Sequence, residues 1–203
     1  MSYIGKTPTA VPLTSSDITN GIITTAKIAD DAISAAKLAA GVGGKVLQVV
    51  HTTKTTIFST SSGSFTDVTG LSASITPSST SSKIQILCNT NLSSEGASGG
   101  LLYFKIMRGI GGTFVNIGES TDSRNGIHAH ISREANESAT HISSTRHNIL
   151  FLDSPSTTSA VTYKAQAGTN GSNTLVIGAG GRSDSNAEDA KYAVDIILME
   201  IGA

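Results

Sequence analysis

From residue 45 onward, short apolar segments alternate with stretches rich in Ser, Thr, Gly and Asn. The apolar segments are residues 45–52, 65–75, 82–92, 101–108, 113–119, 147–153, 160–168, 173–179 and 192–201. Short runs with a period of two, bounded by small polar residues, are typical of antiparallel strands. So many of them in one domain favour a sandwich or barrel. We therefore expect a mainly β fold, with an antiparallel, jelly-roll-like β-sandwich over residues 45–203.

Two of these segments are apolar on both of their alternating faces. They hold Leu101, Leu102, Tyr103, Phe104, Ile106 and Met107 in one case, and Val194, Ile196, Ile197, Leu198, Met199 and Ile201 in the other. A strand with one face in water would alternate apolar and polar residues. Because no long helical segment is available to cover the second face, we expect that face to be buried against another subunit. A homotrimer would satisfy this requirement.

The overall composition narrows the classes of function and location. The chain has 203 residues and a net charge of −1, which leaves no basic surface for nucleic acid. No stretch reaches the roughly 18 apolar residues of a membrane span, and the N-terminus lacks the pattern of a signal peptide. The single Cys88 cannot form an internal disulfide, and it shares a strand face with Ile84 and Ile86. We expect no nucleic acid partner, no membrane insertion and a buried, inert thiol.

Residues 17–44 contain an internal repeat. Large apolar residues recur every five positions, at Ile18, Ile23, Ile28, Ile33 and Leu38, and residues 23–29 align with residues 33–39. A step of five spreads residues around a helix and alternates faces on a strand, so neither element buries them all. The same segment from other chains is the expected partner, which predicts a trimeric stalk ending in the Gly-rich hinge at residues 41–45. An isolated amphipathic helix or an Ala-rich linker stays open as an alternative.

Motifs that could carry catalysis are present but lack the required context. Ser98 lies in a G-x-S-x-G pattern, but a strand-like segment follows where a nucleophile elbow needs a helix. The glycines of residues 41–44 precede Lys45 and Val46, where a phosphate loop needs Ser or Thr after the Lys. Four carboxylates that could hydrolyse a glycosidic bond, Glu119, Asp122, Glu134 and Glu137, have no fixed separation. We therefore expect that the protein is not an enzyme and carries no cofactor.

His128 and His130 form a possible metal pair. Two residues apart, they lie on one side of a predicted strand, where two imidazoles can share an ion. The pair occurs once, within a polar region. Surface histidines are the favoured interpretation, and a metal is not expected.

Five longer stretches can be compared with known families: "MSYIGKTP", "ITTAKIADDAISAAKLA", "GKVLQVVHTTKTT", "FTDVTGLSASITPSSTSSKI" and "IILMEIGA". They resemble fibre-type virion structural proteins of tailed bacteriophages, particularly those of cyanophages. The resemblance implies an anchor to the virion at residues 1–16, a trimeric stalk at residues 17–44 and a C-terminal β knob. It also implies a location in the virion, after assembly in the host cytoplasm, and recognition of a host-surface glycan.

The anchoring segment has no amphipathic period and contains Pro8 and Pro12. Its apolar residues Tyr3, Ile4, Val11 and Leu13 are those that an extended peptide can place in a groove of a virion protein. The expected partner of this segment is a virion protein of the tail or of the capsid. A capsid-decorating head fibre is the alternative, and a glycan-degrading enzyme is less favoured.

The receptor-binding residues are expected between residues 119 and 148. This segment is long and polar, and it contains His128, His130, His141 and His147. Loops on a rigid sandwich are where binding residues concentrate. Planar polar groups suit sugar hydroxyls and acidic sugars, which favours Arg124, Asn125, His128, His130 and Arg133. Residues 127–132 are also the best candidate for an additional edge strand.

Overall fold

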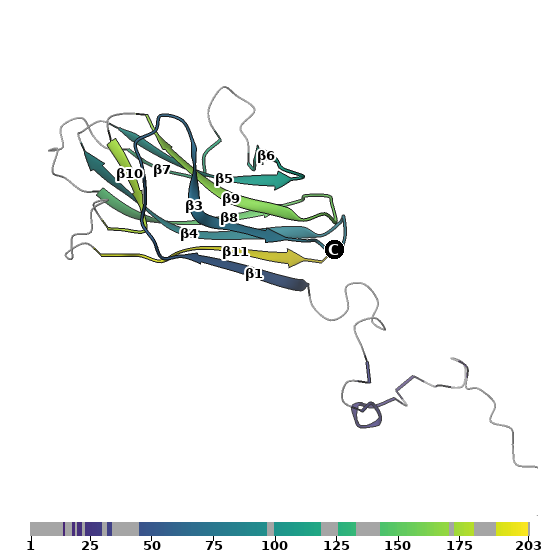
Figure 1. Ribbon diagram of the computed structural model, residues 1–203. Coiled ribbons are helices and arrows are strands. Elements are labelled where there is room, and N and C mark those ends of the chain that lie inside the picture. Colours follow the sequence, from purple (N-terminus) through teal and green to yellow (C-terminus); the bar gives the residue numbers. More distant parts are fainter. Residues whose placement is uncertain are drawn as a thin grey trace, which may run out of the picture. The chain divides into compact units, whose positions relative to one another are not determined.

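The chain divides into two compact units, residues 1–43 and residues 44–203. The computed structural model describes residues 14, 18, 20–21, 23–29, 32–33, 45–96, 100–118, 126–132, 143–170, 173–180 and 190–202. In the first unit the only element among these is a 3-10 turn, η2 (Thr25–Lys27), where the Lys27 amide donates to the Thr24 carbonyl over 2.9 Å. The second unit consists of two antiparallel sheets (Figure 1).

The six-stranded sheet is organised around one long strand, β4 (Lys83–Gly96). On one side, β4 pairs with β11 (Val194–Ile201) and, further along, with β10 (Asn173–Ile177); β8 (Ser143–Asp153) also pairs with β4. The sheet is completed by β1 (Val46–Lys54) beside β11 and by β2 (Phe58–Thr60) beside β10. Its order is β1-β11-β4-β10-β2, with β8 on β4.

The five-stranded sheet has the order β3-β9-β5-β6, and β7 also pairs with β5. Its strands are β3 (Thr66–Ile75), β5 (Leu101–Ile110), β6 (Thr113–Asn116), β7 (Ala129–Ser132) and β9 (Val161–Thr169). β5 and β6 form a hairpin whose turn is Gly111–Gly112. Both glycines have positive φ, 59° and 85°, a conformation that glycine adopts without strain in two-residue turns.

The core lies between the two sheets and is built from alternate residues of each strand. The inward residues are fully buried and include Ile84, Ile86 and Cys88 in β4, Leu102, Phe104 and Ile106 in β5, Val161, Tyr163 and Ala165 in β9, and Val194, Ile196 and Leu198 in β11. The predicted β-sandwich is therefore confirmed, and so is the buried Cys88. Burial raises the pKa of the Cys88 thiol to about 12, which keeps it protonated and unreactive.

One polar network joins the two sheets inside this core. Asp153 of β8 is 7% exposed. It accepts hydrogen bonds from Arg108 Nη1 of β5, over 2.8 and 3.1 Å, and from the Tyr163 hydroxyl of β9, over 2.7 Å. Burial and then the hydrogen bond to Asp153 raise the pKa of Tyr163. Because the carboxylate is paired and hydrogen-bonded, its burial is tolerated.

Every segment predicted as a strand contains one, with differences at the ends. β4 extends four residues beyond the predicted residue 92, to Gly96, because β8 and β10 pair with that part of it. β7 forms within residues 127–132, the candidate edge strand. β2 was not expected. The jelly-roll connectivity and the homotrimer stay predictions. The described part of the chain offers no helix that could cross a membrane.

Candidate interaction surfaces

The apolar residues predicted to face a stalk axis are uncovered in the single chain. Ile18, Ile23, Ile28 and Ile33 are 45%, 52%, 39% and 50% exposed. Leu38 and the predicted anchoring residues Tyr3, Ile4, Val11 and Leu13 lie outside the described residues. The axial role of the isoleucines and the anchoring role of residues 1–16 both stay predictions.

The predicted receptor-binding residues are only partly described. Arg124, Asn125 and Arg133 lie outside the described residues. His128 is half-buried: its Nδ1 accepts from the Ile106 amide over 3.1 Å, and its ring packs edge-on against Phe151 at 6.1 Å between centroids. Burial lowers the pKa of His128, which favours a neutral ring that positions the chain beside β5.

His130 has a different environment. It lies in β7 opposite Tyr103 of β5 and is exposed. Within the described parts of the chain, no three side chains of His, Cys, Asp or Glu come together in a way that could hold a metal. Of the two predicted receptor-binding residues that the structure describes, His130 is therefore exposed, whereas His128 is half-buried.

The outer face of the six-stranded sheet is apolar over four neighbouring strands. The register places Val49, Met199, Gln85 and Leu152 in one row across β1, β11, β4 and β8, and His51, Ile197, Leu87 and Leu150 in the next. We call the apolar side chains of these rows and of the adjoining strand ends the apolar face. Its members are Leu47, Val49, Leu87, Leu150, Leu152, Ile197, Met199 and Ile201.

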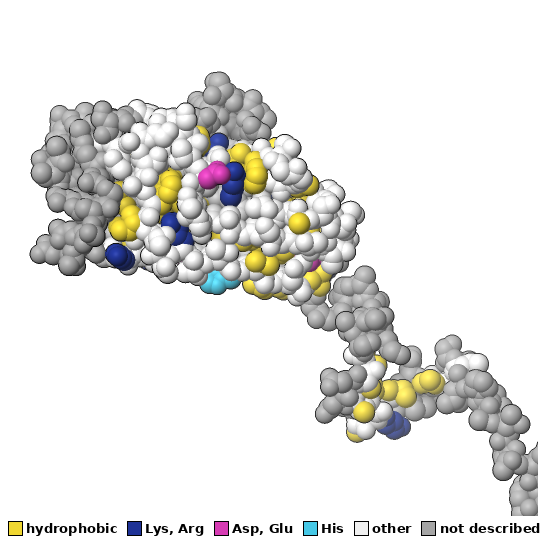
Figure 2. All heavy atoms as spheres, in the orientation of Figure 1, with side chains coloured by type: hydrophobic (Ala, Val, Ile, Leu, Met, Phe, Trp, Pro, Cys, Tyr) yellow, Lys and Arg dark blue, Asp and Glu magenta, His cyan; other side chains and the backbone are white. Residues whose placement is uncertain are grey.

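In the single chain the apolar face is exposed on its outer strands, β1 and β8, and partly exposed on β4 and β11. Leu150 is 63% exposed, Val49 58%, and Leu47 and Leu152 51% each. Figure 2 shows apolar side chains along the lower edge of the domain, where Figure 1 places β1. Single exposed apolar residues are ordinary, but a contiguous group spread over four strands is typical of an interaction surface.

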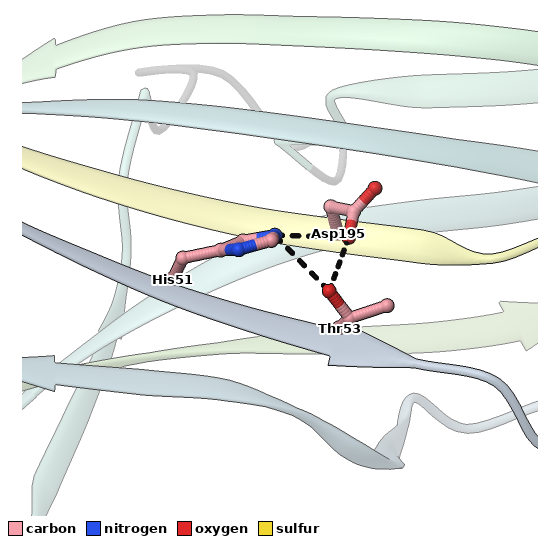
Figure 3. A network of polar contacts seen from close by, with 3 residues as sticks. All are labelled: His51, Thr53 and Asp195. Atoms are coloured by element: carbon pink, nitrogen blue, oxygen red, sulfur yellow. Dashed lines mark hydrogen bonds and ion pairs between the residues drawn. The ribbon is translucent and has the colours of Figure 1, made fainter.

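A polar cluster borders the apolar face on β1 and β11 (Figure 3). The Thr53 hydroxyl donates to Asp195 Oδ1 over 2.7 Å, and His51 Nε2 lies 3.0 Å from the same oxygen and 3.1 Å from Thr53 Oγ1. The hydrogen bond from Thr53, and after it that from His51, lowers the pKa of Asp195, although partial burial opposes this. The carboxylate is therefore charged at neutral pH.

This cluster does not have the geometry of a nucleophilic relay. In a relay the imidazole uses one ring nitrogen for the hydroxyl and the other for the carboxylate. Here both partners meet at His51 Nε2, so the arrangement does not activate Thr53. The cluster is better described as a polar border of the apolar face.

Comparisons with known proteins place the chain in no family. No protein-family model and no curated protein matches it. Among solved structures, a chain from the structure of infectious bursal disease virus, Gx strain, is similar, with a TM-score of 0.36 and 16% identity over 77% of this chain. The matched part is 37% of the length of that chain. At this TM-score the likeness carries no inference about function.

Proposed function

We propose that this protein is a fibre-type virion structural protein that acts as a homotrimer. In this proposal residues 1–16 attach to another protein of the virion, in the tail or in the capsid. Residues 17–44 form a trimeric stalk, and the sandwich is a knob that recognises a host-surface glycan. The sequence resemblance to phage fibres supports the type of protein. The observation that carries the proposal is the apolar face, which is open on a single chain.

Two separate apolar surfaces would be covered by one association. The first consists of the exposed isoleucines of the repeat, and the second is the apolar face. The second begins on β1, the first strand after the repeat in sequence. Chains that associate along the repeat bring their β1 strands to a high local concentration, which favours contact between the apolar faces. Removal of this area from water supplies the driving force, at about 25 cal/mol per Å².

Sedimentation equilibrium on the full chain tests this assembly. We expect the mass of three chains at micromolar concentration. In the double variant Leu150→Ser/Leu152→Ser, two side chains of the apolar face lose their apolar contacts, and dissociation should occur at about tenfold higher concentration or more. Val115→Ser is the matched control, because Val115 is 43% exposed but belongs to the other sheet. A folded wild-type monomer at these concentrations would contradict the proposal.

The proposed role is adhesive and not catalytic. Purified protein should bind to host cells or host polysaccharide without releasing reducing sugar. Release of reducing sugar at a rate proportional to protein concentration would instead favour the glycan-degrading alternative. Labelling of residue 1 on intact particles distinguishes attachment to the tail from attachment to the capsid.

A further inference from the structure

The outer face of the five-stranded sheet carries aromatic and planar polar side chains in neighbouring rows. One row contains Tyr103 of β5, with Gly168 of β9 on one side and His130 of β7 on the other. The next row contains Asp67 of β3, Gln166 of β9 and Lys105 of β5. Figure 2 shows acidic, basic and apolar side chains side by side on this face, where Figure 1 places β5 and β9.

Gly168 allows an aromatic pair to form on this face. A Cβ at this position would lie 3.3 Å from the Ser64 carbonyl oxygen and 3.5 Å from Phe65 Cα, so the chain before β3 crosses close to β9 because residue 168 has no side chain. The Phe65 and Tyr103 ring centroids are 6.2 Å apart at an interplanar angle of 46°. Both rings are partly exposed. Lys105 Nζ lies over the Phe65 ring, 3.9 Å from its centroid, so the apolar ring surface offered to a ligand is that of Tyr103 and the uncovered part of Phe65.

The neighbouring polar groups are held in a fixed arrangement. Asp67 accepts hydrogen bonds from Lys164 Nζ over 2.7 Å and from Gln166 Nε2 over 2.8 Å. Lys164 Nζ also lies 3.9 Å from the Phe114 ring centroid, and that ring rests on Gly109, where an added Cβ would clash with it. The carboxylate side chain of Asp67 is 53% exposed. A ligand therefore meets polar groups whose rotamers are already restricted, which lowers the entropy cost of binding.

We propose that this face, with Phe65, Tyr103 and His130 beside Asp67 and Gln166, is a polysaccharide-binding site. A sugar ring has an apolar C–H face and an edge of hydroxyl groups that both donate and accept hydrogen bonds. Aromatic side chains complement the former. A carboxylate accepts from the hydroxyls, whereas an amide both accepts and donates. A protein partner would require a larger apolar centre with few charges, and this face has charged residues at its centre.

This inference deepens the proposed function, and it rests on the proposed recognition of a host glycan by the knob. The main contacts with the glycan are then made by the five-stranded sheet and not by the segment 119–148. His130 belongs to both. The apolar face lies on the other sheet. Ligand binding and association can therefore be altered separately by substitution.

Affinity electrophoresis of the full chain tests the site. The native gels contain either laminarin, a neutral β-glucan, or alginate, a polyuronate. We expect at least one of them to retard the protein, and we expect Tyr103→Ala and Gln166→Ala each to weaken the retardation about tenfold. Ser74→Ala is the matched control. Ser74 hydrogen-bonds Thr162 on the same face, away from the rings of Phe65 and Tyr103, and this variant should be retarded as much as the parent. Retardation by alginate that disappears with salt would identify an acidic polysaccharide, and salt-independent retardation by laminarin a neutral one; both support the site.

Two results would overturn the inference. One is the absence of retardation by both polysaccharides, or retardation that Tyr103→Ala and Gln166→Ala leave unchanged. The other is a change in the sedimentation mass of these two variants, which would identify the face as a subunit contact. The proposed function fails differently: a monomer that binds laminarin or alginate through Tyr103 and Gln166 would retain the site and exclude the trimer.

Discussion

At the scale of single residues, the buried carboxylate Glu200 connects three segments of the sandwich. It lies in β11 and is 1% exposed. One of its oxygens accepts from the Ser78 amide over 2.7 Å and from the Ser78 hydroxyl over 2.6 Å, and the other accepts from Gln48 Nε2 of β1 over 2.7 Å. These bonds attach the connection between β3 and β4 to the edge of the six-stranded sheet. A charged group can be buried here because donors surround it.

Glu200 should make stability depend on pH under acidic conditions. Burial alone would raise the pKa of this carboxyl, but the hydrogen bonds from Ser78 and Gln48 lower it to about 2, from an ordinary value of 4.5. The folded state therefore binds fewer protons than the unfolded state between these values. The stabilisation is complete above about pH 4.5 and is lost as the pH falls toward 2. We expect Glu200→Gln to be less stable than the parent at neutral pH.

Calorimetric melting of both proteins from neutral pH down to about pH 2 measures this effect. The difference in Tm between parent and Glu200→Gln should narrow as the pH falls below about 4.5. The comparison of two proteins cancels the titration of the other carboxylates, provided they are not coupled to this site. A difference that stays constant over the whole range would show that Glu200 does not titrate as described.

A residue's surroundings can be predicted from one sequence only where its neighbours are close to it along the chain. Cys88 was predictable, because its neighbours Ile84 and Ile86 show which strand face it shares. The pair His51 and Asp195 was not, because 144 positions separate them and only the register of β1 with β11 brings them together. The same holds for Tyr103 and Gln166, which become neighbours through the pairing of β5 with β9.

At the scale of elements, the alternation of apolar residues was sufficient to find the strands with strong patterns. β9, for example, buries Val161, Tyr163 and Ala165 and leaves the residues between them partly exposed. β2 was not predicted because it has three residues, too few to show an alternating pattern. It forms through its pairing with β10, a segment far away in the sequence. Strand order and register also remained unknown, since they depend on pairings between distant segments.

The end of β10 offers a test of how a turn is specified. Gly178 follows β10 with φ at +89°, and a Cβ there would lie 3.0 Å from the Thr56 carbonyl oxygen. Its amide donates to Asn91 Oδ1 over 2.8 Å, so the backbone cannot easily move away. Gly178→Ala should lower the free energy of unfolding by about 2–3 kcal/mol, because it combines backbone strain with a close contact.

Gly112→Ala is the matched control for this substitution. Gly112 has a φ of +85°, and an added Cβ meets nothing within 4 Å. This variant should lose only the backbone contribution, about 1 kcal/mol. Urea denaturation of the two variants and the parent measures both values. Equal losses would mean that the contact with Thr56 contributes nothing.

At the scale of the whole molecule, the two units differ in whether their described apolar residues are buried. The core residues, from Val68 to Leu198, all belong to residues 44–203. The described isoleucines of the first unit are exposed. The sequence indicated this difference through the change from a five-residue repeat to alternating segments. It also indicated that some strands have a second apolar face, but not where that face lies, because its position follows from the strand order.

A chain that starts at Gly44 should therefore fold without the first unit. The sandwich contains its own core, its buried Asp153 network and the hydrogen bonds of Glu200, so circular dichroism should show β structure and heating should give one cooperative transition.

Association of this shortened chain should be weaker than that of the full chain, since the repeat no longer raises the local concentration of the apolar faces. Sedimentation equilibrium should then show dissociation at a higher protein concentration than for the full chain, and Tm should rise with concentration in the range where the oligomer forms. An unfolded or aggregated product would mean that residues 1–43 are required for folding. An oligomer of unchanged affinity would mean that the sandwich alone drives association and that the isoleucine repeat has another role.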